Sequence, residues 1–194
     1  MRLGENDFWT DVARLRSVLP GQSQVIDETE LTDAAASIAF SSIPAGFRRL
    51  ILIVEARTDR ADEADGVLVQ FNSDAGSNYD YIRFYASSAT AATVSAARAT
   101  TSIMIGQGEA ASSRASNWAP CEATIYNYAE TDREKWVSTG IAGRMGDVSA
   151  DADIVAGWQY GRWRDTDAIT GITILPQVGP NFVAGTKATL YGVL

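Results

Sequence analysis

Short runs of β-favouring residues, each followed by turn-forming residues, recur along most of this 194-residue chain. From Ser37 onward the runs are rich in Val, Ile, Thr and aromatic residues, and Gly, Pro, Asn and Asp gather between them. About ten strands are predicted in this way, at residues 37–43, 49–57, 67–72, 79–86, 100–105, 122–128, 135–141, 154–163, 169–175 and 186–193. The pattern predicts an all-β fold, an antiparallel two-sheet β-sandwich of jelly-roll type.

Hydrophobic patterning within two of these strands indicates which side chains face the core. Residues 50–54 read Leu-Ile-Leu-Ile-Val without a polar position, so this strand is predicted to be central and covered on both faces. Strand 79–86 alternates instead, and its apolar side is predicted to face the core; that side carries Ile82, Phe84 and Ala86. The other side is predicted to turn away from the core, and it carries Tyr79, Tyr81, Arg83 and Tyr85.

Strand 154–163 adds further aromatic residues. Trp158 and Tyr160 share one face of it, and Trp163 lies on the opposite face. Exposed rows of aromatic side chains bind sugars by stacking or form subunit interfaces, where Tyr, Trp and Arg are enriched, and the same residues also fill cores. These alternatives stay open for the candidate interface or glycan-contact residues of both strands, which are Tyr79, Tyr81, Arg83, Tyr85, Trp158 and Tyr160.

The C-terminal segment reads as two strands, 169–175 and 186–193, joined by a Pro/Gly-rich turn. Pro176 and Gly179 are among the residues that interrupt the ladder, because proline lacks an N–H donor and glycine allows positive φ. The second strand alternates Ala188 and Leu190 on one side with Thr189 and Tyr191 on the other. The C-terminus is therefore predicted to be tied into a sheet.

The N-terminal segment, residues 1–36, is predicted to be a helix and linker that precede a β-sandwich domain at 37–194. Apolar residues recur at helical spacing over 6–19, and Pro20-Gly21 ends the helix. Residues 21–36 are polar, acidic and alanine-rich, which is typical of a linker. Two interpretations of the helix are open: it packs against the sandwich or a neighbouring subunit, or it is an anchoring arm that docks on a larger particle through Phe8, Trp9, Val12 and Leu15.

Charge and composition exclude several classes of protein. The chain has 16 cations and 24 acids, a net charge of −8, so it lacks the basic character expected of a nucleic-acid partner. No apolar run approaches the ~20 residues that a bilayer span requires, and no apolar segment of a signal peptide follows residues 1–7. The single cysteine, Cys121, excludes an intramolecular disulfide and is interpreted as a small buried hydrophobic residue.

The chain contains no histidine, which removes Ser-His-Asp and Cys-His nucleophiles and most zinc sites. No glycine-rich phosphate loop opens a helix. We therefore expect no enzyme, no catalytic residue and no cofactor. A tight loop carries the side-chain oxygens of Asn72, Asp74, Asn78 and Asp80. These oxygens either bind a hard cation or cap the turn by accepting hydrogen bonds from its backbone.

Three motifs follow one another in an order that resembles a known class of module. They are Phe40-Ser-Ser-Ile-Pro44, Phe71-Asn-Ser-Asp-Ala-Gly-Ser-Asn-Tyr79 and a C-terminal motif that runs from Ile169 to Gly192. The last motif includes Pro176-Gln-Val-Gly-Pro-Asn-Phe182 and ends in Leu190-Tyr-Gly192. Together they look like the β-sandwich modules of structural proteins from tailed bacteriophages, found in tail fibres, tail tips, head fibres and capsid decorations. The C-terminal motif resembles the closing hairpin of such modules. The likeness spans roughly residues 37–194.

The resemblance implies a virion structural protein that is displayed on the particle surface, assembled in the host cytoplasm and released by lysis. Its expected partners are two further copies in a homotrimer, other capsid or tail proteins, and a host surface glycan; nucleic acid and membrane insertion are not expected. The 36 residues before the sandwich are too few for a fibre shaft, which favours capsid decoration, a head fibre or tail-tip attachment. The alternative function is a free-standing carbohydrate-binding module, similar to a lectin.

Overall fold

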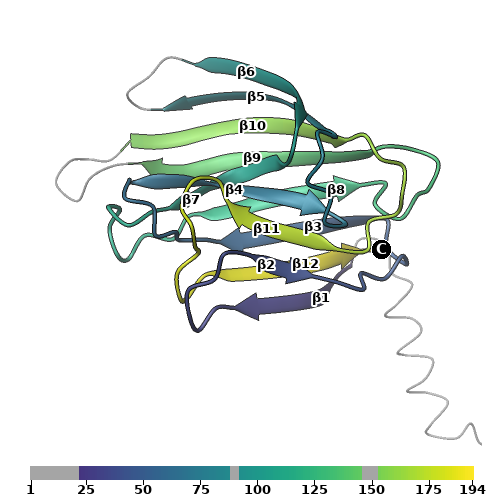
Figure 1. The fold of residues 1–194 in the computed structure, drawn as a ribbon, viewed down its shortest axis with the longest axis horizontal. Coiled ribbons are helices and arrows are strands. Elements are labelled where there is room, and N and C mark those ends of the chain that lie inside the picture. The colour runs from purple at the N-terminus through teal and green to yellow at the C-terminus, as the bar shows by residue number, and fades with distance from the viewer. Residues whose placement is uncertain (1–21, 88–91, 146–152) are drawn as a thin grey trace, which may run out of the picture.

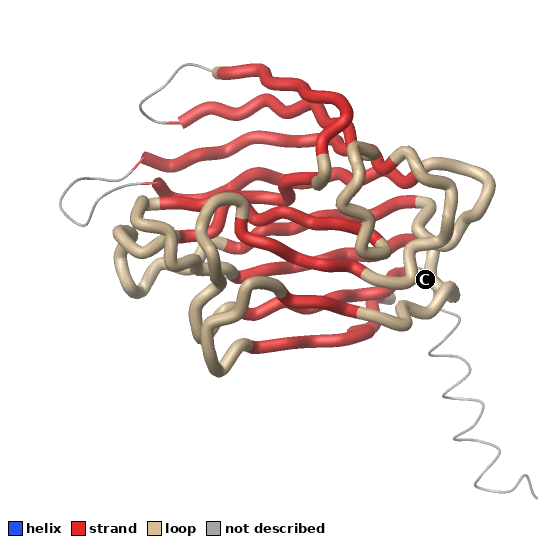
Figure 2. The backbone as a smooth tube through the Cα atoms, viewed as in Figure 1, coloured by secondary structure: helices blue, strands red, loops and turns tan. Residues whose placement is uncertain are grey.

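The computed structural model describes residues 22–87, 92–145 and 153–194, and this part of the chain folds into two antiparallel sheets (Figures 1 and 2). The predicted helix at 6–19, with the candidate anchor residues Phe8, Trp9, Val12 and Leu15, lies outside the described residues. Within the described residues, no helix has the length and apolarity needed to cross a membrane. The predicted all-β sandwich is confirmed.

The larger sheet contains eight strands in the order β1-β12-β3-β8-β9-β10-β5-β6. These are β1 (Ser23–Glu30), β12 (Lys187–Val193), β3 (Arg49–Glu55), β8 (Pro120–Tyr126), β9 (Lys135–Met145), β10 (Asp153–Trp163), β5 (Tyr79–Ser87) and β6 (Thr93–Thr100). The smaller sheet contains four strands in the order β2-β11-β4-β7. These are β2 (Ile38–Phe40), β11 (Ile172–Pro176), β4 (Ala64–Phe71) and β7 (Ile103–Glu109).

The strand order is that of a jelly roll with additions. The chain passes between the sheets at the connections β1–β2, β2–β3, β3–β4, β4–β5, β6–β7, β7–β8, β10–β11 and β11–β12, so both halves of the chain contribute strands to each sheet. The hairpin of β9 and β10 is inserted between β8 and β5, and β12 and β1 extend the sheet beside β3. The larger sheet is consequently wider than the smaller one, and Figure 1 shows β5 and β6 at one end of it.

The hydrophobic core lies between the two sheets. On the larger sheet, β3 buries Leu50, Leu52 and Val54 completely, and β8 buries Cys121 and Ile125, which confirms the interpretation of the cysteine as a small buried residue. The smaller sheet contributes the residues that face them, Ile38, Phe40, Val67, Val69, Phe71, Ile103, Ile105, Ile172 and Ile174. Burial raises the pKa of the Cys121 thiol to about 12, so the thiolate is scarce at neutral pH.

The prediction that strand 49–57 is covered on both faces is wrong. β3 is central, between β12 and β8, but Ile51 and Ile53 point to the outer face and remain partly exposed. No third layer covers this outer face in the described part of the chain. A continuous apolar run therefore marks a strand whose outer side chains are only half covered.

The prediction that residues 21–36 form a linker is also wrong, since β1 pairs with β12 over most of its length. β1 is an edge strand with both faces largely exposed, and its polar, acidic residues suit that position. The Glu28 carboxylate accepts a hydrogen bond from the Thr189 hydroxyl at 3.0 Å and lies 3.2 Å from the Lys187 ammonium. β6 was missed for the same reason, because its Ala/Ser/Thr-rich sequence has no buried face.

The two C-terminal strands do not form a hairpin. β11 pairs with β2 and β4 in the smaller sheet, whereas β12 lies between β1 and β3 in the larger one. The connection between them crosses from sheet to sheet, and the buried Asp65 carboxylate holds it by accepting backbone N–H bonds from Val178 and Gly179. The predicted alternation of β12 and its place inside a sheet are confirmed.

One corner of the sandwich fixes how β5 and β10 are oriented. The connection from β4 to β5 turns at Asn72 and Ser73, which both have positive φ (50° and 59°). The Asp74 carboxylate then accepts a hydrogen bond of 2.7 Å from the indole N–H of Trp163, and this bond holds the pKa of Asp74 below its usual value. The rings of Tyr79 and Trp163 stack, with centroids 6.3 Å apart, and both side chains are buried.

This corner reverses the predicted orientation of strand 79–86. Because Tyr79 faces inward, the alternation of the strand turns Tyr81, Arg83 and Tyr85 inward as well. Ile82 and Phe84 point to the outer face and are 48% and 42% exposed. The prediction that Ile82, Phe84 and Ala86 face the core is wrong. The apolar character of Ile82 and Phe84 indicated the wrong side, because the buried aromatic corner decides which side of β5 faces inward.

The corner predicts opposite outcomes for two tryptophans of the same strand. Replacing Trp163→Phe removes the indole donor to Asp74 and part of a buried ring, so we expect the free energy of unfolding to fall by about 3 kcal/mol. Trp158→Phe, on the exposed face of β10, should change it by less than about 0.5 kcal/mol. Urea denaturation measures both values. Equal losses in the two variants would contradict the assignment of the faces.

Candidate functional site

The outer face of the larger sheet carries the exposed hydrophobic side chains of β5, β6, β8, β9 and β10. We call this surface the aromatic face; it consists of Ile82, Phe84, Val94, Tyr126, Trp136, Trp158 and Tyr160, all between 41% and 70% exposed. Scattered exposed hydrophobic residues need no explanation, but a contiguous group indicates a contact surface. The aromatic face is therefore the strongest candidate for a functional site in the described residues.

Strand register arranges the aromatic face in three rows across the sheet. The first row runs Glu122, Gly140, Trp158, Phe84 and Val94. The second row runs Thr124, Ser138, Tyr160, Ile82 and Ala96. The third row runs Tyr126, Trp136, Arg162 and Asp80. Directly opposed side chains in neighbouring strands touch, so each row is a continuous strip of surface.

The first row is mainly apolar at its β10, β5 and β6 end. The rings of Phe84 and Trp158 lie 6.1 Å apart between centroids at an angle of 50°, and Val94 is the most exposed large hydrophobic residue at 70%. Gly140 places no side chain beside Trp158, which leaves one edge of the indole open toward a shallow hollow that also touches Ile53. The apolar area of such a strip is removed from water only when another surface covers it.

The third row is organised by one arginine. The Arg162 guanidinium contacts the Asp80 carboxylate at 2.5 Å and the Glu134 carboxylate at 3.0 Å, and its central carbon lies 5.9 Å from the centre of the Trp136 ring. Hydrogen bonds from Arg162 hold the pKa of Asp80 below its usual value, and Asp80 in turn raises the pKa of Arg162. The guanidinium is therefore fixed in one orientation between two acids and an aromatic ring.

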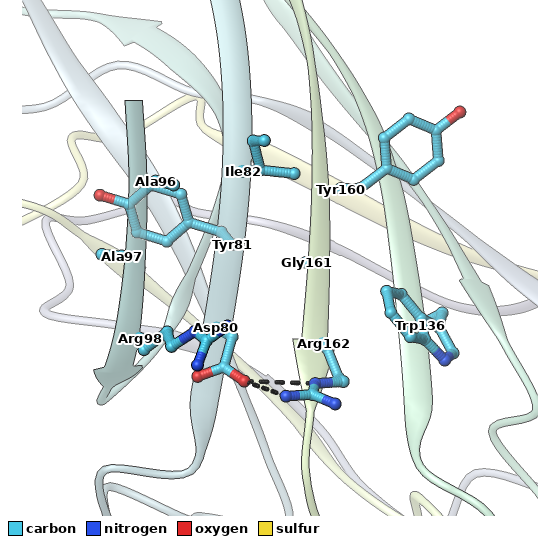
Figure 3. Close-up of a pocket in the computed structure, with 10 residues that line it drawn as sticks. All are labelled: Asp80, Tyr81, Ile82, Ala96, Ala97, Arg98, Trp136, Tyr160, Gly161 and Arg162. Atoms are coloured by element: carbon cyan, nitrogen blue, oxygen red, sulfur yellow. Dashed lines mark hydrogen bonds and ion pairs between the residues drawn. The ribbon is translucent and has the colours of Figure 1, made fainter. Parts of the chain in front are cut away.

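An open hollow of about 480 Å³ lies between the second and third rows. Its lining, drawn in Figure 3, consists of Asp80, Tyr81, Ile82, Ala96, Ala97, Arg98, Trp136, Tyr160, Gly161 and Arg162. Small residues of β6 and β10 leave room in its lining, and Figure 3 places Tyr160 and Trp136 along one side with the Asp80–Arg162 pair at one end. The hollow thus combines two half-exposed aromatic rings with a fixed charged pair.

The structure divides the candidate interface or glycan-contact residues between two faces. Trp158 and Tyr160 lie together on the outer face, with Trp163 buried opposite, as predicted. The four residues of β5, namely Tyr79, Tyr81, Arg83 and Tyr85, face inward instead, with Tyr79 buried, and the prediction that they turn away from the core is wrong. Their roles in an interface or in glycan contact stay predictions.

Arg83 lies between the two partly buried tyrosines of its row. Its guanidinium carbon is 5.6 Å from the centre of the Tyr81 ring and 5.3 Å from that of Tyr85. These cation–π contacts stabilise an arginine on the inward side of β5. The Arg83 guanidinium also contacts the Met104 sulfur of β7 at 3.6 Å, and Tyr85 packs against Met104 and Val155, so the row lies against β7 and β10.

Sequence reasoning missed Trp136, Phe84 and Arg162 as members of the site. The alternation of side chains along strand 135–141 could have placed Trp136. Val137 faces the core, so its neighbour Trp136 must point to the outer face. Phe84 was assigned to the core because the orientation of its strand was reversed. Arg162 alternates with Trp163 and could have been placed beside Tyr160 from spacing alone.

The side-chain oxygens of Asn72, Asp74 and Asp80 in the 72–80 loop accept hydrogen bonds from donors of the protein itself. The Asn72 carboxamide oxygen accepts backbone N–H bonds from Thr170 and Gly171. The Asp74 carboxylate accepts from Trp163, Asn78 and the Gly76 backbone, and Asp80 is bound to Arg162 on the outer face. Within the described ranges, no group of three or more acidic or cysteine side chains could hold a metal ion.

Comparison with protein-family models and with curated proteins gives no match to this chain. Among solved structures, one similar chain belongs to the structure of infectious bursal disease virus, Gx strain, at 10% identity and a TM-score of 0.10. The alignment covers 89% of this chain and 34% of that one, so this chain spans about a third of its length. A likeness of this size carries no argument about fold or function.

Proposed function

We propose that this chain is a structural protein of a tailed bacteriophage virion, displayed on the particle surface, and that the aromatic face packs against neighbouring protein subunits. The observation that carries the proposal is the exposed strip of Trp158, Phe84 and Val94 on the outer face of a jelly roll. Aromatic residues are enriched where protein surfaces bind one another. The neighbours are further copies of this chain in a trimer, or other capsid or tail proteins.

The sequence motifs support a structural module. The Phe71–Tyr79 motif forms the aromatic corner: Asn72 and Asp74 bind backbone and indole donors, and the Tyr79 hydroxyl donates to the Asp74 carbonyl at 3.0 Å. These residues hold the two sheets together. Because these residues stabilise the fold, proteins that share the fold can share the motif. The resemblance to phage sandwich modules therefore supports a virion structural protein but not a particular position on the particle.

Capsid decoration, a head fibre and a tail-tip protein all agree with the described residues. In each case the predicted helix at 6–19 is the proposed anchor, through Phe8, Trp9, Val12 and Leu15, while the sandwich is exposed. A jelly roll that packs through one face of its larger sheet leaves its loops free for other contacts.

A second candidate is a free-standing carbohydrate-binding module, favoured by the hollow beside Trp136 and Tyr160. Such a module would act alone, so it needs no particle. The two candidates therefore differ in where the protein is found and in what covers the first row. The absence of histidine argues against an enzyme of the Ser-His-Asp type in either case.

The first prediction of this proposal concerns location. We expect the protein to be a stoichiometric component of particles purified from a lysate of the phage that encodes it, measured by quantitative mass spectrometry. A host cytoplasmic enzyme carried through the same gradient serves as the control for contamination. Recovery of the protein in the soluble fraction only would contradict the virion proposal and leave the carbohydrate-binding module.

The second prediction concerns assembly. Sedimentation equilibrium should show a trimer, and the double substitution Phe84→Ser and Trp158→Ser should weaken its association by more than about ten-fold, because such aromatic anchors dominate interface energies. Val178→Ser is the matched control, since Val178 is 60% exposed but lies on the connection between β11 and β12. A variant lacking residues 1–21 identifies any contribution of the predicted helix. A monomer at every concentration, or a trimer unaffected by the double substitution, would contradict the proposed interface.

A further inference from the structure

The hollow between Tyr160 and Trp136 has a different chemistry from the apolar first row. Its aromatic side chains are half exposed, at 49% and 46%, and they lie beside a fixed pair of charges, Asp80 and Arg162. An interface between proteins would cover this charged pair at a cost in desolvation. The combination of flat apolar rings with planar polar groups suits a ligand that presents both C–H and O–H groups.

The guanidinium of Arg162 still has donors available. Of its five N–H groups, the described contacts use the Nε–H and one on Nη2 for Asp80, and one on Nη1 for Glu134. Two N–H groups thus have no partner among the described residues, and the Asp80 carboxylate, with two bonds from Arg162 on one oxygen and one from the Ala99 N–H on the other, retains lone pairs. A neighbouring hydroxyl can accept from Arg162, and the next one can donate to Asp80.

The lining of the hollow leaves the space that a ring needs. Gly161 contributes no side chain, and Ala96 and Ala97 contribute only methyl groups. The volume of about 480 Å³ falls within the range of small-molecule sites, which is 300 to 1,000 Å³. Because Arg162 lies over the Trp136 ring and binds two acids, the rings and the polar groups keep their relative positions before a ligand arrives.

The local charge selects among ligands that could use such a site. Three arginines lie at the hollow and its rim, and two of them are held by protein acceptors: Arg162 by Asp80 and Glu134, and Arg164, which lies 3.8 Å from Asp80, by the Ser77 carbonyl. A phosphate or nucleotide would require several cations that are not already bound to acids of the protein, and a purely apolar ligand would leave the free donors of Arg162 without partners. We propose that the hollow binds a pyranose ring of a neutral glycan in contact with both Tyr160 and Trp136, with adjacent hydroxyls bound by Arg162 and Asp80.

This site does not depend on the proposed virion location. It occupies the second and third rows, whereas the proposed subunit contact uses Trp158, Phe84 and Val94 of the first row. A particle protein would use the site to hold a host surface polysaccharide, and a free module would use it in the same way. Glycan binding by the isolated protein and its presence in particles are therefore separate results.

The test is binding of the purified full chain to an array of neutral and acidic bacterial oligosaccharides, followed by calorimetric titration with the neutral oligosaccharide retained most strongly. We expect binding to a neutral glycan, and a loss of about five-fold or more in affinity for Trp136→Ala and for Tyr160→Ala, because contact with each ring is worth about 1 kcal/mol or more. Arg162→Lys, which keeps the charge but loses the planar fork, should weaken binding as well.

Val178→Ser is the control, because it removes an exposed hydrophobic side chain that lies outside both the hollow and the first row. Its affinity should equal that of the unaltered protein, and thermal unfolding of every variant confirms that each one is folded. No retained glycan, retention of acidic glycans alone, or an equal loss in Val178→Ser and Trp136→Ala would each overturn the proposed site.

Discussion

The hydrogen bond from the Trp163 indole to the Asp74 carboxylate is the interaction on which the rest of the larger sheet depends. It joins the connection between β4 and β5 to the end of β10, and it places Trp163 and Tyr79 as stacked rings inside the sandwich. Strand alternation then leaves no choice for the residues that follow. Asp80, Ile82 and Phe84 point outward beside Arg162, Tyr160 and Trp158, and the aromatic face is the result.

A second constraint leaves the aromatic face exposed to solvent. The hairpin of β9 and β10 is inserted into the order of a jelly roll, which widens the larger sheet relative to the smaller one. The outer face has no covering layer in the described residues, and it carries apolar side chains in the first row and a charged pair beside aromatic rings in the third. The two kinds of chemistry on one sheet are the reason to assign subunit packing and glycan binding to different rows.

The sequence predicted the fold class and the position of most strands, because alternation and turn residues are local signals. It failed for β1 and β6, which are edge strands without a buried face, and it joined β11 and β12 into a hairpin because a Pro/Gly-rich turn does not reveal which sheet each strand enters. Trp158 and Tyr160 were placed on a common face from spacing alone. The orientation of Tyr81 and Phe84 could not be obtained locally, since it is set by a bond between residues 74 and 163.

Hydroxyl-radical footprinting with mass-spectrometric detection tests the central claim, that the corner turns the aromatic face outward to make contacts. In the isolated protein at low concentration, Phe84, Trp136 and Trp158 should be oxidised rapidly and Tyr79 and Trp163 slowly. In purified particles Phe84 and Trp158 should become protected. Rapid oxidation of Trp163 in the folded protein, or oxidation of Trp158 at the same rate free and on the particle, would contradict the account.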